Sequence, residues 1–225
     1  MRYPEAWQRG QSLGERIGSE LRLRILEGEL PAGETISENK VAAEFGTSRS
    51  PVRDALKTLA NEGLIRLERM GAVVVGMGAQ EVEELYDVRC LIESFAQRRL
   101  ADRFDDRLAE QLGRIIDRLE LAARHRDPVE FACQDMAFHE TIVAAANHSR
   151  IWQLWRSIRQ IVLAVMLITT REVFSEGGAR VAGVVDKHRA LLTGLRSGRP
   201  DEIEATVRAY FADSYATLHK SIPRP

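Results

Sequence analysis

Residues 46–57 read Gly-Thr-Ser-Arg-Ser-Pro-Val-Arg-Asp-Ala-Leu-Lys, and this stretch decides the fold of the first part of the chain. Ser48 is a favourable N-cap residue, and Pro51 falls in the first helical turn, where its missing N–H costs no hydrogen bond. Apolar side chains follow with helical spacing on one face: Val52, Ala55, Leu56 and Leu59. Three cations recur every four residues on the neighbouring face: Arg49, Arg53 and Lys57. The pattern predicts a short helix that packs through one side and presents positive charge on another.

A second short helix is predicted directly before it. Ser37 can cap a helix that continues to Glu44 and has Val41, Ala42 and Phe45 as its apolar side. Gly46 is placed to end that helix in a left-handed turn. The order helix, turn, helix is that of a helix-turn-helix, whose second helix carries guanidinium groups to phosphates and guanine edges.

A hairpin is predicted after the second helix. Gly63 can end the helix, and residues 64–67 then alternate in polarity. Met70-Gly71 can form a turn, and the short segment 72–75 that follows is rich in β-branched residues. We interpret this segment as a two-stranded wing with Arg66 and Arg69 near its tip. The alternative is an ordinary surface helix with solvated charge beside an unrelated hairpin, and the agreement of four ordered features favours the winged helix.

Several motifs of this region resemble a known family. They are residues 26–33 (Leu-Glu-Gly-Glu-Leu-Pro-Ala-Gly), 36–38 (Ile-Ser-Glu), 48–56 (Ser-Arg-Ser-Pro-Val-Arg-Asp-Ala-Leu) and 62–65 (Glu-Gly-Leu-Ile). About residues 12–76 closely resemble the winged-helix domain of GntR-family bacterial transcription regulators. The resemblance implies binding to a double-stranded DNA operator, an inverted repeat, as a dimer.

The same resemblance suggests which residues contact DNA. Arg49 and Arg53 match the base- and phosphate-contacting arginines of the family, and Asn39 stands where some members carry a further arginine. This departure bears on which operator sequence is read. The expected DNA-binding residues are Arg49, Ser50, Arg53, Lys57, Asn39, Arg69 and Gly71.

Charge and composition agree with a soluble regulator. Through Gly78 there are eleven Lys and Arg against eleven Asp and Glu, so positive charge must act by gathering on one face rather than by excess. The longest apolar run, residues 161–168, is too short to span a bilayer, and the N-terminus carries no signal peptide. Cys90 and Cys133 lie far apart, which favours reduced core cysteines. We therefore expect a cytoplasmic protein without membrane contact.

The rest of the chain predicts helices separated by clear breaks. Gly76-Met77-Gly78 forms a hinge, and breaks follow at 147–149, 177–178 and 198–200. Helices are expected near 80–101, 105–124, 128–146, 150–172, 179–197 and 201–219. Residues 161–168 are apolar on all sides, which predicts a central helix or one shared with a dimer interface.

Four polar side chains interrupt the apolar stripes of these helices: Arg89, Asp135, His139 and His188. Burying such groups unpaired is costly, so they should meet one another, a metal or a ligand. Asp135 and His139 are four residues apart on one helical face, which suits two ligands of one metal ion. The alternative is a buried Asp–His pair with a separate core histidine.

Residues 79–220 also resemble a known domain, through the motifs at 85–89, 135–142, 146–147 and 187–192. They resemble FCD, the all-helical effector domain of the fatty-acid-regulator branch of the GntR family. Many such domains hold a divalent metal through one Asp and three His beside a small carboxylate effector. Asp135, His139 and His188 match three of these ligands.

The fourth ligand position departs from the family because Tyr210 replaces the usual histidine. A phenol with a pKa near 10 is a poor ligand at neutral pH, and Tyr210 can instead hydrogen-bond to Asp135 or to the effector. Two alternatives stay open: three protein ligands plus water hold Zn²⁺ or a similar ion weakly, or the site is metal-free and binds the effector directly. The expected effector-binding residues are Arg89, Tyr210 and Asn147.

The sequence therefore predicts a mainly α fold. An N-terminal winged helix-turn-helix with a small two-stranded wing (residues 1–76) precedes an all-α antiparallel bundle (79–225) for effector binding and dimerisation. The predicted function is a homodimeric, ligand-responsive transcription regulator, usually a repressor in this family, and not an enzyme. Two alternatives are a metal-dependent hydrolase that uses the Asp and His residues, and a constitutive DNA-binding protein with a structural bundle.

Overall fold

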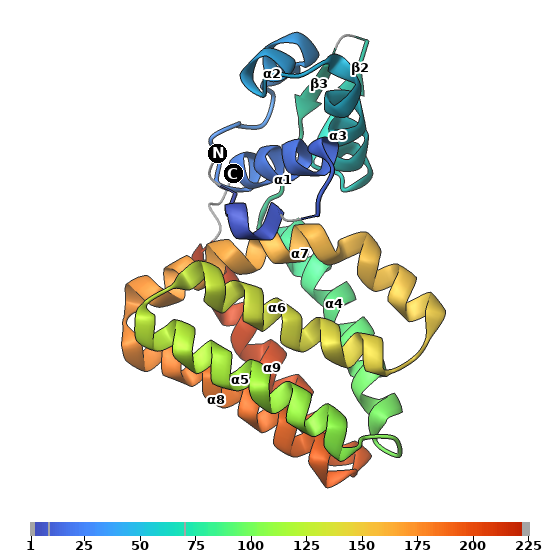
Figure 1. Ribbon diagram of the computed structural model, residues 1–225, viewed down its shortest axis with the longest axis vertical. Helices are drawn as coiled ribbons and strands as arrows, with labels where there is room; N and C mark the ends of the chain where they lie inside the picture. The colour runs from blue at the N-terminus through green and yellow to red at the C-terminus, as the bar shows by residue number, and fades with distance from the viewer. Residues whose placement is uncertain (1–2, 9, 70, 222–225) are drawn as a thin grey trace. The chain divides into compact units, whose positions relative to one another are not determined.

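The computed structural model describes residues 3–8, 10–69 and 71–221, and it divides into two compact units (Figure 1). The first unit runs to Glu81 and the second from Val82 to Ser221. The first contains η1 (Glu5–Gln8), α1 (Leu13–Leu26), β1 (Thr35–Ser37), α2 (Glu38–Glu44), α3 (Arg49–Asn61), β2 (Ile65–Glu68) and β3 (Gly71–Val74). The second contains helices, whose bounds are given below, so the predicted mainly α fold is confirmed.

The helix-turn-helix forms where the sequence predicts it. Gly46 ends α2 with φ +60°, and Gly63 follows α3 with φ +77°. Ser48 occupies the N-cap of α3, although its side chain makes no capping hydrogen bond. The four apolar residues of α3 are all buried: Val52, Ala55, Leu56 and Leu59. The cationic face is therefore left to solvent, as the periodicity predicts.

α3 is anchored by close packing on α1, which begins with a capping box between Ser12 and Glu15. A Cβ at Gly18 would lie 3.8 Å from Ala55, so the two helices approach closely there. A buried ion pair adds to this contact, because Arg22 donates to both oxygens of Glu62 at 2.7 and 2.6 Å. These contacts fix the direction of α3 in its unit.

The wing is larger than predicted. β2 and β3 pair as expected, but β1 adds a third antiparallel strand, and the sheet order is β1-β3-β2. The predicted pair of strands is thus present as β2 and β3. β1 was not predicted because a strand of three residues shows no periodicity and its partner lies far away in sequence. Met70, expected at the wing turn, lies outside the described residues.

Gly71 has a structural position rather than a surface one. It is buried in β3 opposite Ser37, and a Cβ there would lie 2.1 Å from the carbonyl oxygen of Ile36. Its φ of +151° is also a conformation that side chains rarely adopt. The structure therefore gives Gly71 the role of admitting β1 to the sheet, and the DNA contact expected from the sequence stays a prediction.

The helical unit follows the predicted breaks closely. Its helices are α4 (Ala79–Leu100, whose first turn belongs to the first unit), α5 (Asp106–His125), α6 (Pro128–Ala145), α7 (Ser149–Glu176), α8 (Gly178–Ser197) and α9 (Pro200–Ser221). Asp127 caps α6 by accepting from two backbone N–H groups, directly before Pro128. The largest difference is at the end of α7, which continues beyond the expected residue 172 until Gly177 breaks it.

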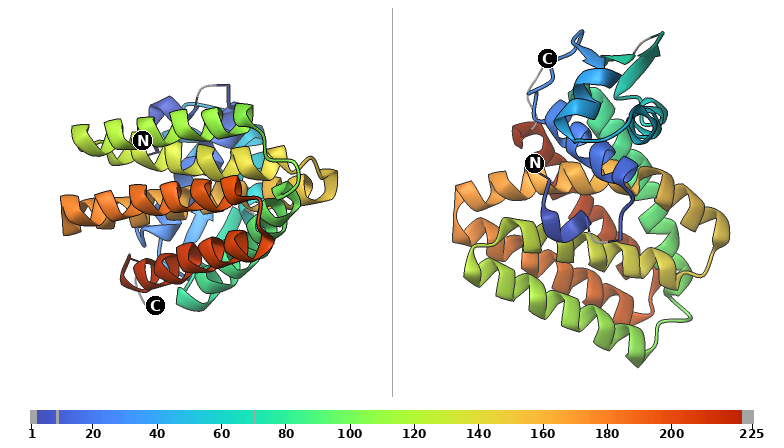
Figure 2. Two further views of the ribbon diagram at one scale, coloured as in Figure 1. Left: turned by 90° about the horizontal axis from the view of Figure 1, so that it is seen from below. Right: turned by 45° about the horizontal axis from the view of Figure 1, so that its top comes forward.

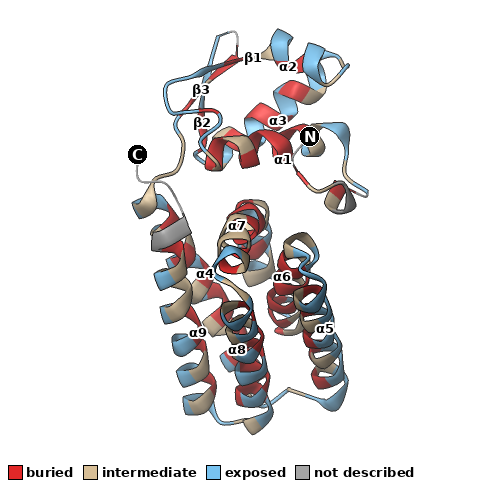
Figure 3. Cartoon of the chain, turned by 90° about the vertical axis from the view of Figure 1, so that its left-hand side faces the viewer, coloured by how far each residue is buried: buried red, intermediate tan, exposed pale blue. Residues whose placement is uncertain are grey.

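The helices of this unit lie in three layers, α5 with α6, α7 with α8, and α4 with α9 (left panel of Figure 2). Each helix carries its buried residues on the side that faces its neighbours (Figure 3). Residues 161–167 of α7 are all buried, as the apolar run predicts. These layers bring α4, α6, α8 and α9 around one interior site.

α7 is long and apolar enough to cross a membrane by length and composition alone. In this structure 44% of an apolar stretch of 18 residues in this helix is buried inside the protein. The helix packs against α6, α8 and α9. A central helix of a bundle has the same composition, so these contacts account for its hydrophobicity.

Candidate functional site

A cluster of buried polar side chains lies in the interior of the helical unit. Asp135 and His139 come from α6 and His188 from α8, and their ligand atoms all lie within 4.8 Å of one another. Asp135 Oδ1 is 3.2 Å from His139 Nε2 and 3.0 Å from His188 Nε2. The three residues expected as metal ligands are thus brought together from two helices.

The outer nitrogens of both imidazoles have partners of their own. His139 Nδ1 lies 2.5 Å from Glu93 Oε2, and His188 Nδ1 lies 2.8 Å from the carbonyl oxygen of Val184. A carbonyl can only accept, so His188 Nδ1 donates, and the Nε2 of a neutral His188 presents a lone pair toward the Asp135 carboxylate. Such an arrangement requires either a proton or a cation at that position. Histidines that bind metal commonly have this outer partner.

Tyr210 of α9 occupies the centre of the cluster. Its hydroxyl is 2.8 Å from His139 Nε2 and 3.5 Å from Asp135 Oδ1. Burial, and then the charge of Asp135, raise the pKa of Tyr210 well above its ordinary value, so the phenol stays protonated. The hydrogen bond expected between this tyrosine and Asp135 is present at 3.5 Å, and burial disfavours a phenolate ligand.

The acidic and imidazole side chains of the cluster shift one another's pKa values. Burial alone would raise the pKa of Asp135, but His188 and His139 hold it well below its usual range. Burial lowers the pKa of His139, yet Glu93 outweighs this effect and raises it above the ordinary value overall. The carboxylates around His139 therefore favour its protonated form.

Arg89 of α4 joins the cluster through Glu93, one turn further on. Its Nε donates to Glu93 Oε1 at 2.6 Å, and the two side chains are 1% and 0% exposed. The guanidinium also lies over the ring of Tyr86, 5.1 Å from its centre, and over Phe211 at 5.3 Å. Its Nη2 is buried and has no hydrogen-bond partner among the described residues. One strong donor of Arg89 is thus left for a further acceptor.

A small cavity of about 50 Å³ lies beside this cluster. Arg89, Asp135 and Tyr210 line it. Hydroxyl groups also line it: Thr169 and Thr170 of α7, and Ser214 and Thr217 of α9. Lys187 reaches its edge and forms an ion pair with Asp213. The cavity thus combines cations with many hydroxyl groups.

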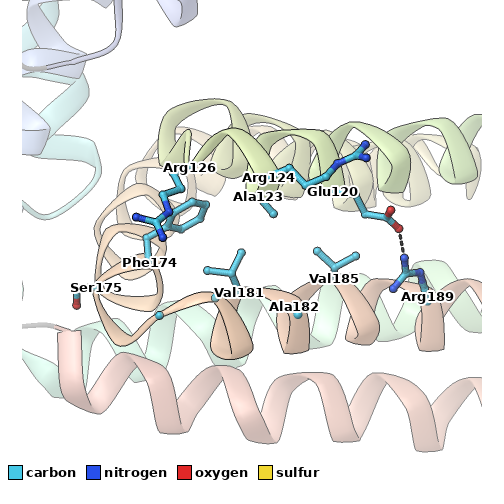
Figure 4. A pocket seen from close by; sticks show the side chains of 12 residues that line it. Glu120, Ala123, Arg124, Arg126, Phe174, Ser175, Val181, Ala182, Val185 and Arg189 are labelled. Atoms are coloured by element: carbon cyan, nitrogen blue, oxygen red, sulfur yellow. Dashed lines mark hydrogen bonds and ion pairs between the residues drawn. The ribbon is translucent and has the colours of Figure 1, made fainter.

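A larger hollow of about 620 Å³ lies elsewhere, between α5, the end of α7 and α8 (Figure 4). Its apolar floor is already covered, because Val181 and Val185 are 5% and 3% exposed. Arg189 at its rim is already paired with Glu120 and Asp186. Arg124 and Arg126 also line the hollow, as exposed side chains. The interior cavity differs from it because the free donor of Arg89 there is buried.

Asn147, which we expected at the effector site, is not brought there. It is exposed, does not line the cavity, and has a left-handed backbone with φ +47°. Asparagine tolerates this conformation, so Asn147 acts in the turn between α6 and α7. His148 caps α7 by accepting from Ile151 N–H, and His125 is exposed at the end of α5. Neither of these histidines lines the cavity beside the cluster.

The expected DNA-contacting side chains lie on the surface of the first unit. Exposed residues are Asn39 of α2, Arg49, Ser50, Arg53 and Lys57 of α3, and Arg69 after β2. Arg53 Nε donates to both carboxylate oxygens of Glu38 at 3.0 and 2.9 Å. Sequence reasoning had no basis for singling out Glu38, because an acidic residue in the first turn of a helix is ordinary.

Comparison with known proteins identifies both units. Residues 13–75 match the family of bacterial regulatory proteins called gntR, and residues 84–213 match the FCD domain. The chain belongs to the GntR family. As a member of this family it is a DNA-binding transcription regulator with an FCD effector-binding domain. It is not an enzyme, and the hydrolase alternative is set aside.

Relatives of this GntR regulator include two proteins named gluconate operon transcriptional repressor. The one from Bacillus licheniformis is 39% identical over 94% of this chain and 87% of its own length. The one from Bacillus subtilis (strain 168) is also 39% identical, over 87% of this chain and 80% of its own length. The solved structure described as E. coli McbR/YncC has the same fold, with a TM-score of 0.72 at 18% identity over 93% of this chain and 98% of that one.

Proposed function

We propose that this GntR regulator is a cytoplasmic, homodimeric repressor whose FCD domain binds a sugar acid such as gluconate. The observation that carries the proposal is the interior cavity, where an unpaired Arg89 donor and several hydroxyl groups meet the Asp135 cluster. A sugar acid combines a carboxylate with hydroxyl groups, which matches both kinds of partner. The gluconate operon repressors among its relatives support the same choice.

The residues of the cluster also fit a divalent metal ion. Asp135, His139 and His188 would hold it, because the outer partners of both imidazoles leave their Nε2 atoms facing Asp135 Oδ1. A bound ion such as Zn²⁺ would supply a cationic anchor for the carboxylate of the effector. Tyr210 leaves the fourth protein position without a good ligand, so a coordination position stays available to the effector.

The charges of the cluster favour a single carboxylate as effector. Arg89 is cationic, whereas Glu93 and Asp135 are anionic, since the pKa values of both carboxyl groups are lowered. With neutral imidazoles and a divalent ion, the sum is one positive charge. One carboxylate neutralises it, and a dicarboxylate would overcompensate it.

Effector binding requires this unit to change shape. A cavity of about 50 Å³ admits water but not a six-carbon acid. The helices that line it must therefore separate, and α4 is one of them because it carries Arg89. α4 begins at Ala79, directly after the hinge at residues 76–78. Its movement supports a coupling between the effector site and DNA binding.

The test uses three ligands of matched size. D-Gluconate has the carboxylate and the hydroxyl groups, sorbitol has hydroxyl groups without the carboxylate, and hexanoate has a carboxylate without hydroxyl groups. We expect gluconate to raise the thermal unfolding temperature and to release a DNA duplex selected by the protein, and the other two to act far more weakly. If neither these three ligands nor any other small acid has an effect, constitutive DNA binding with a structural bundle is favoured.

We also propose that the dimer forms through the outer face of α4. Val88 and Leu91, one turn apart, are 42% and 72% exposed, which is unusual for large apolar side chains in one place. Leu91→Asp is expected to shift the protein from dimer to monomer at micromolar concentration, as measured by sedimentation. The matched control is Leu121→Asp on α5, where a single leucine is 48% exposed.

The control variant should remain dimeric. Sedimentation of the unmodified protein as a monomer would contradict the dimer itself. A dimer that survives Leu91→Asp would place the interface elsewhere in the chain.

A further inference from the structure

The ion pair between Glu38 and Arg53 joins the two helices of the helix-turn-helix without being needed to hold them together. Arg53 is 52% exposed and Glu38 is 18% exposed, and such partly exposed pairs contribute little to stability. The buried contacts of Val52 and Leu56 already fix α3 in its unit. We therefore look for a role of this ion pair other than stabilising the fold.

The geometry of the pair determines which edge of Arg53 is available. Glu38 accepts from Nε with both oxygens, at 3.0 and 2.9 Å. Within the described ranges, Nη1 and Nη2 of Arg53 have no acceptor. These two nitrogens form the fork that pairs with O6 and N7 of guanine. An arginine held in this way also loses less side-chain entropy when it binds a base.

The pair also cancels charge at this position. Affinity for any DNA sequence depends on how many cations neutralise phosphates. Arg53 next to a carboxylate contributes little to that general attraction, whereas Arg49 is exposed and has no ion-pair partner in the part of the chain that the structure describes. Lys57 has only a 4.0 Å contact with Asp54. On this face of α3, Arg49 and Lys57 therefore supply most of the attraction to the phosphates of any DNA sequence.

We propose that Glu38 is a positioning residue that determines specificity. It holds Arg53 with its Nη fork free and removes the net charge of that side chain. Arg53 then distinguishes the operator from other DNA instead of strengthening binding to all DNA. The inference rests on the proposed role of Arg53 in contacting a base.

The experiment compares Glu38→Gln, Glu38→Ala and Arg53→Ala in the full-length protein. Glutamine keeps an acceptor for Nε but removes the charge, and alanine removes both. The matched control is Glu44→Gln in the same helix, where Glu44 pairs with Arg24 at 2.9 Å and is 52% exposed. Binding is measured by fluorescence anisotropy over a KCl series. The probes are a duplex that the unmodified protein selects from a random library and a scrambled duplex of equal composition.

We expect Glu38→Gln to bind the scrambled duplex about five-fold more tightly near physiological salt, with the salt dependence steeper by about one charge. Its affinity for the selected duplex should rise less, so discrimination falls. Glu38→Ala should in addition lose affinity for the selected duplex, because Arg53 is no longer positioned. Glu44→Gln should change both affinities together, and Arg53→Ala should lose discrimination.

Two results would overturn the inference. If both Glu38 variants keep full discrimination while Arg53→Ala loses it, Glu38 is a structural contact only. If Glu44→Gln lowers discrimination as much as Glu38→Gln, the effect is one of general charge. Retention of discrimination by Arg53→Ala would instead show that the assignment of Arg53 to a base is wrong. Thermal unfolding of each variant shows that the fold is kept.

Discussion

Arg89→Ala is expected to lower the free energy of unfolding by about 3–5 kcal/mol and to abolish the thermal shift caused by gluconate. The substitution leaves the Glu93 carboxylate buried without its guanidinium partner, and an unpaired buried charge is strongly destabilising. Chemical denaturation at pH 7 measures the first effect, and thermal unfolding with and without gluconate measures the second.

Matched variants separate stability from effector binding. Arg159→Ala removes one side of a partly exposed ion pair with Glu140, so its cost should be about 1 kcal/mol or less. The double variant Arg89→Met with Glu93→Gln removes both charges and should recover most of the stability without recovering the gluconate response. A single Arg89 variant that keeps the full gluconate shift would exclude this arginine from the effector site.

The loss in Arg89→Ala should also depend on pH. In the folded protein the pKa of Glu93 lies below its ordinary value, because Arg89 and His139 outweigh burial. That stabilisation is present above the ordinary pKa of a glutamate and is lost as the pH falls through the folded pKa. In the variant, burial favours the protonated carboxyl. The difference between the two proteins should therefore shrink as the pH falls, beginning above the ordinary glutamate pKa of about 4.3 and continuing below it.

Tyr210→His is expected to raise the affinity for Zn²⁺ on the order of 100-fold. The Tyr210 hydroxyl now lies 2.8 Å from His139 Nε2, at the point to which the ligand atoms are directed. A histidine is shorter, so it frees this space and supplies a fourth nitrogen from the same helix. Calorimetric titration of chelator-stripped protein measures the affinity.

The controls test whether the gain comes from this cluster. His188→Ala in the Tyr210→His background should remove the gain. Tyr215→His makes the same change on α9, where the tyrosine hydroxyl bonds to Asp87 instead, and should leave the affinity unchanged. The unmodified protein and Tyr210→His should both bind Zn²⁺ more tightly as the pH rises through the raised pKa of His139, since the metal ion competes with the proton of this imidazole. Equal affinity of the unmodified protein and Tyr210→His would show that Tyr210 does not limit the site.

Much of the fold followed from local sequence features. The helix bounds were predictable because Gly46, Gly63 and Asp127 combine strong end signals with clear apolar periodicity beside them. β1 could not be predicted, since three residues hold no pattern and its pairing depends on the close approach that Gly71 allows. The conformation of Asn147 was equally hidden, because a turn residue and a ligand-binding residue are both polar.

The site was predictable in its residues but not in its contacts. Asp135, His139 and His188 stand out as polar positions in apolar stripes, and the resemblance to FCD domains suggests that they share one metal site. The bond between Glu93 and His139 spans 46 residues of sequence and depends on how α4 packs on α6. The pairing of Glu38 with Arg53 likewise depends on the crossing of two helices. Such contacts between distant segments have no signature in a single sequence.

The position of Arg89 in α4 has a consequence for how the two ligands compete. It lies ten residues after the start of a helix that follows the hinge, about 15 Å along the axis. If gluconate weakens operator binding by some factor, equilibrium thermodynamics requires the operator to weaken gluconate binding by the same factor. Protein bound to its operator then binds gluconate more weakly than free protein does. In the presence of operator DNA, a variant unable to bind DNA should therefore respond to lower gluconate concentrations than the unmodified protein.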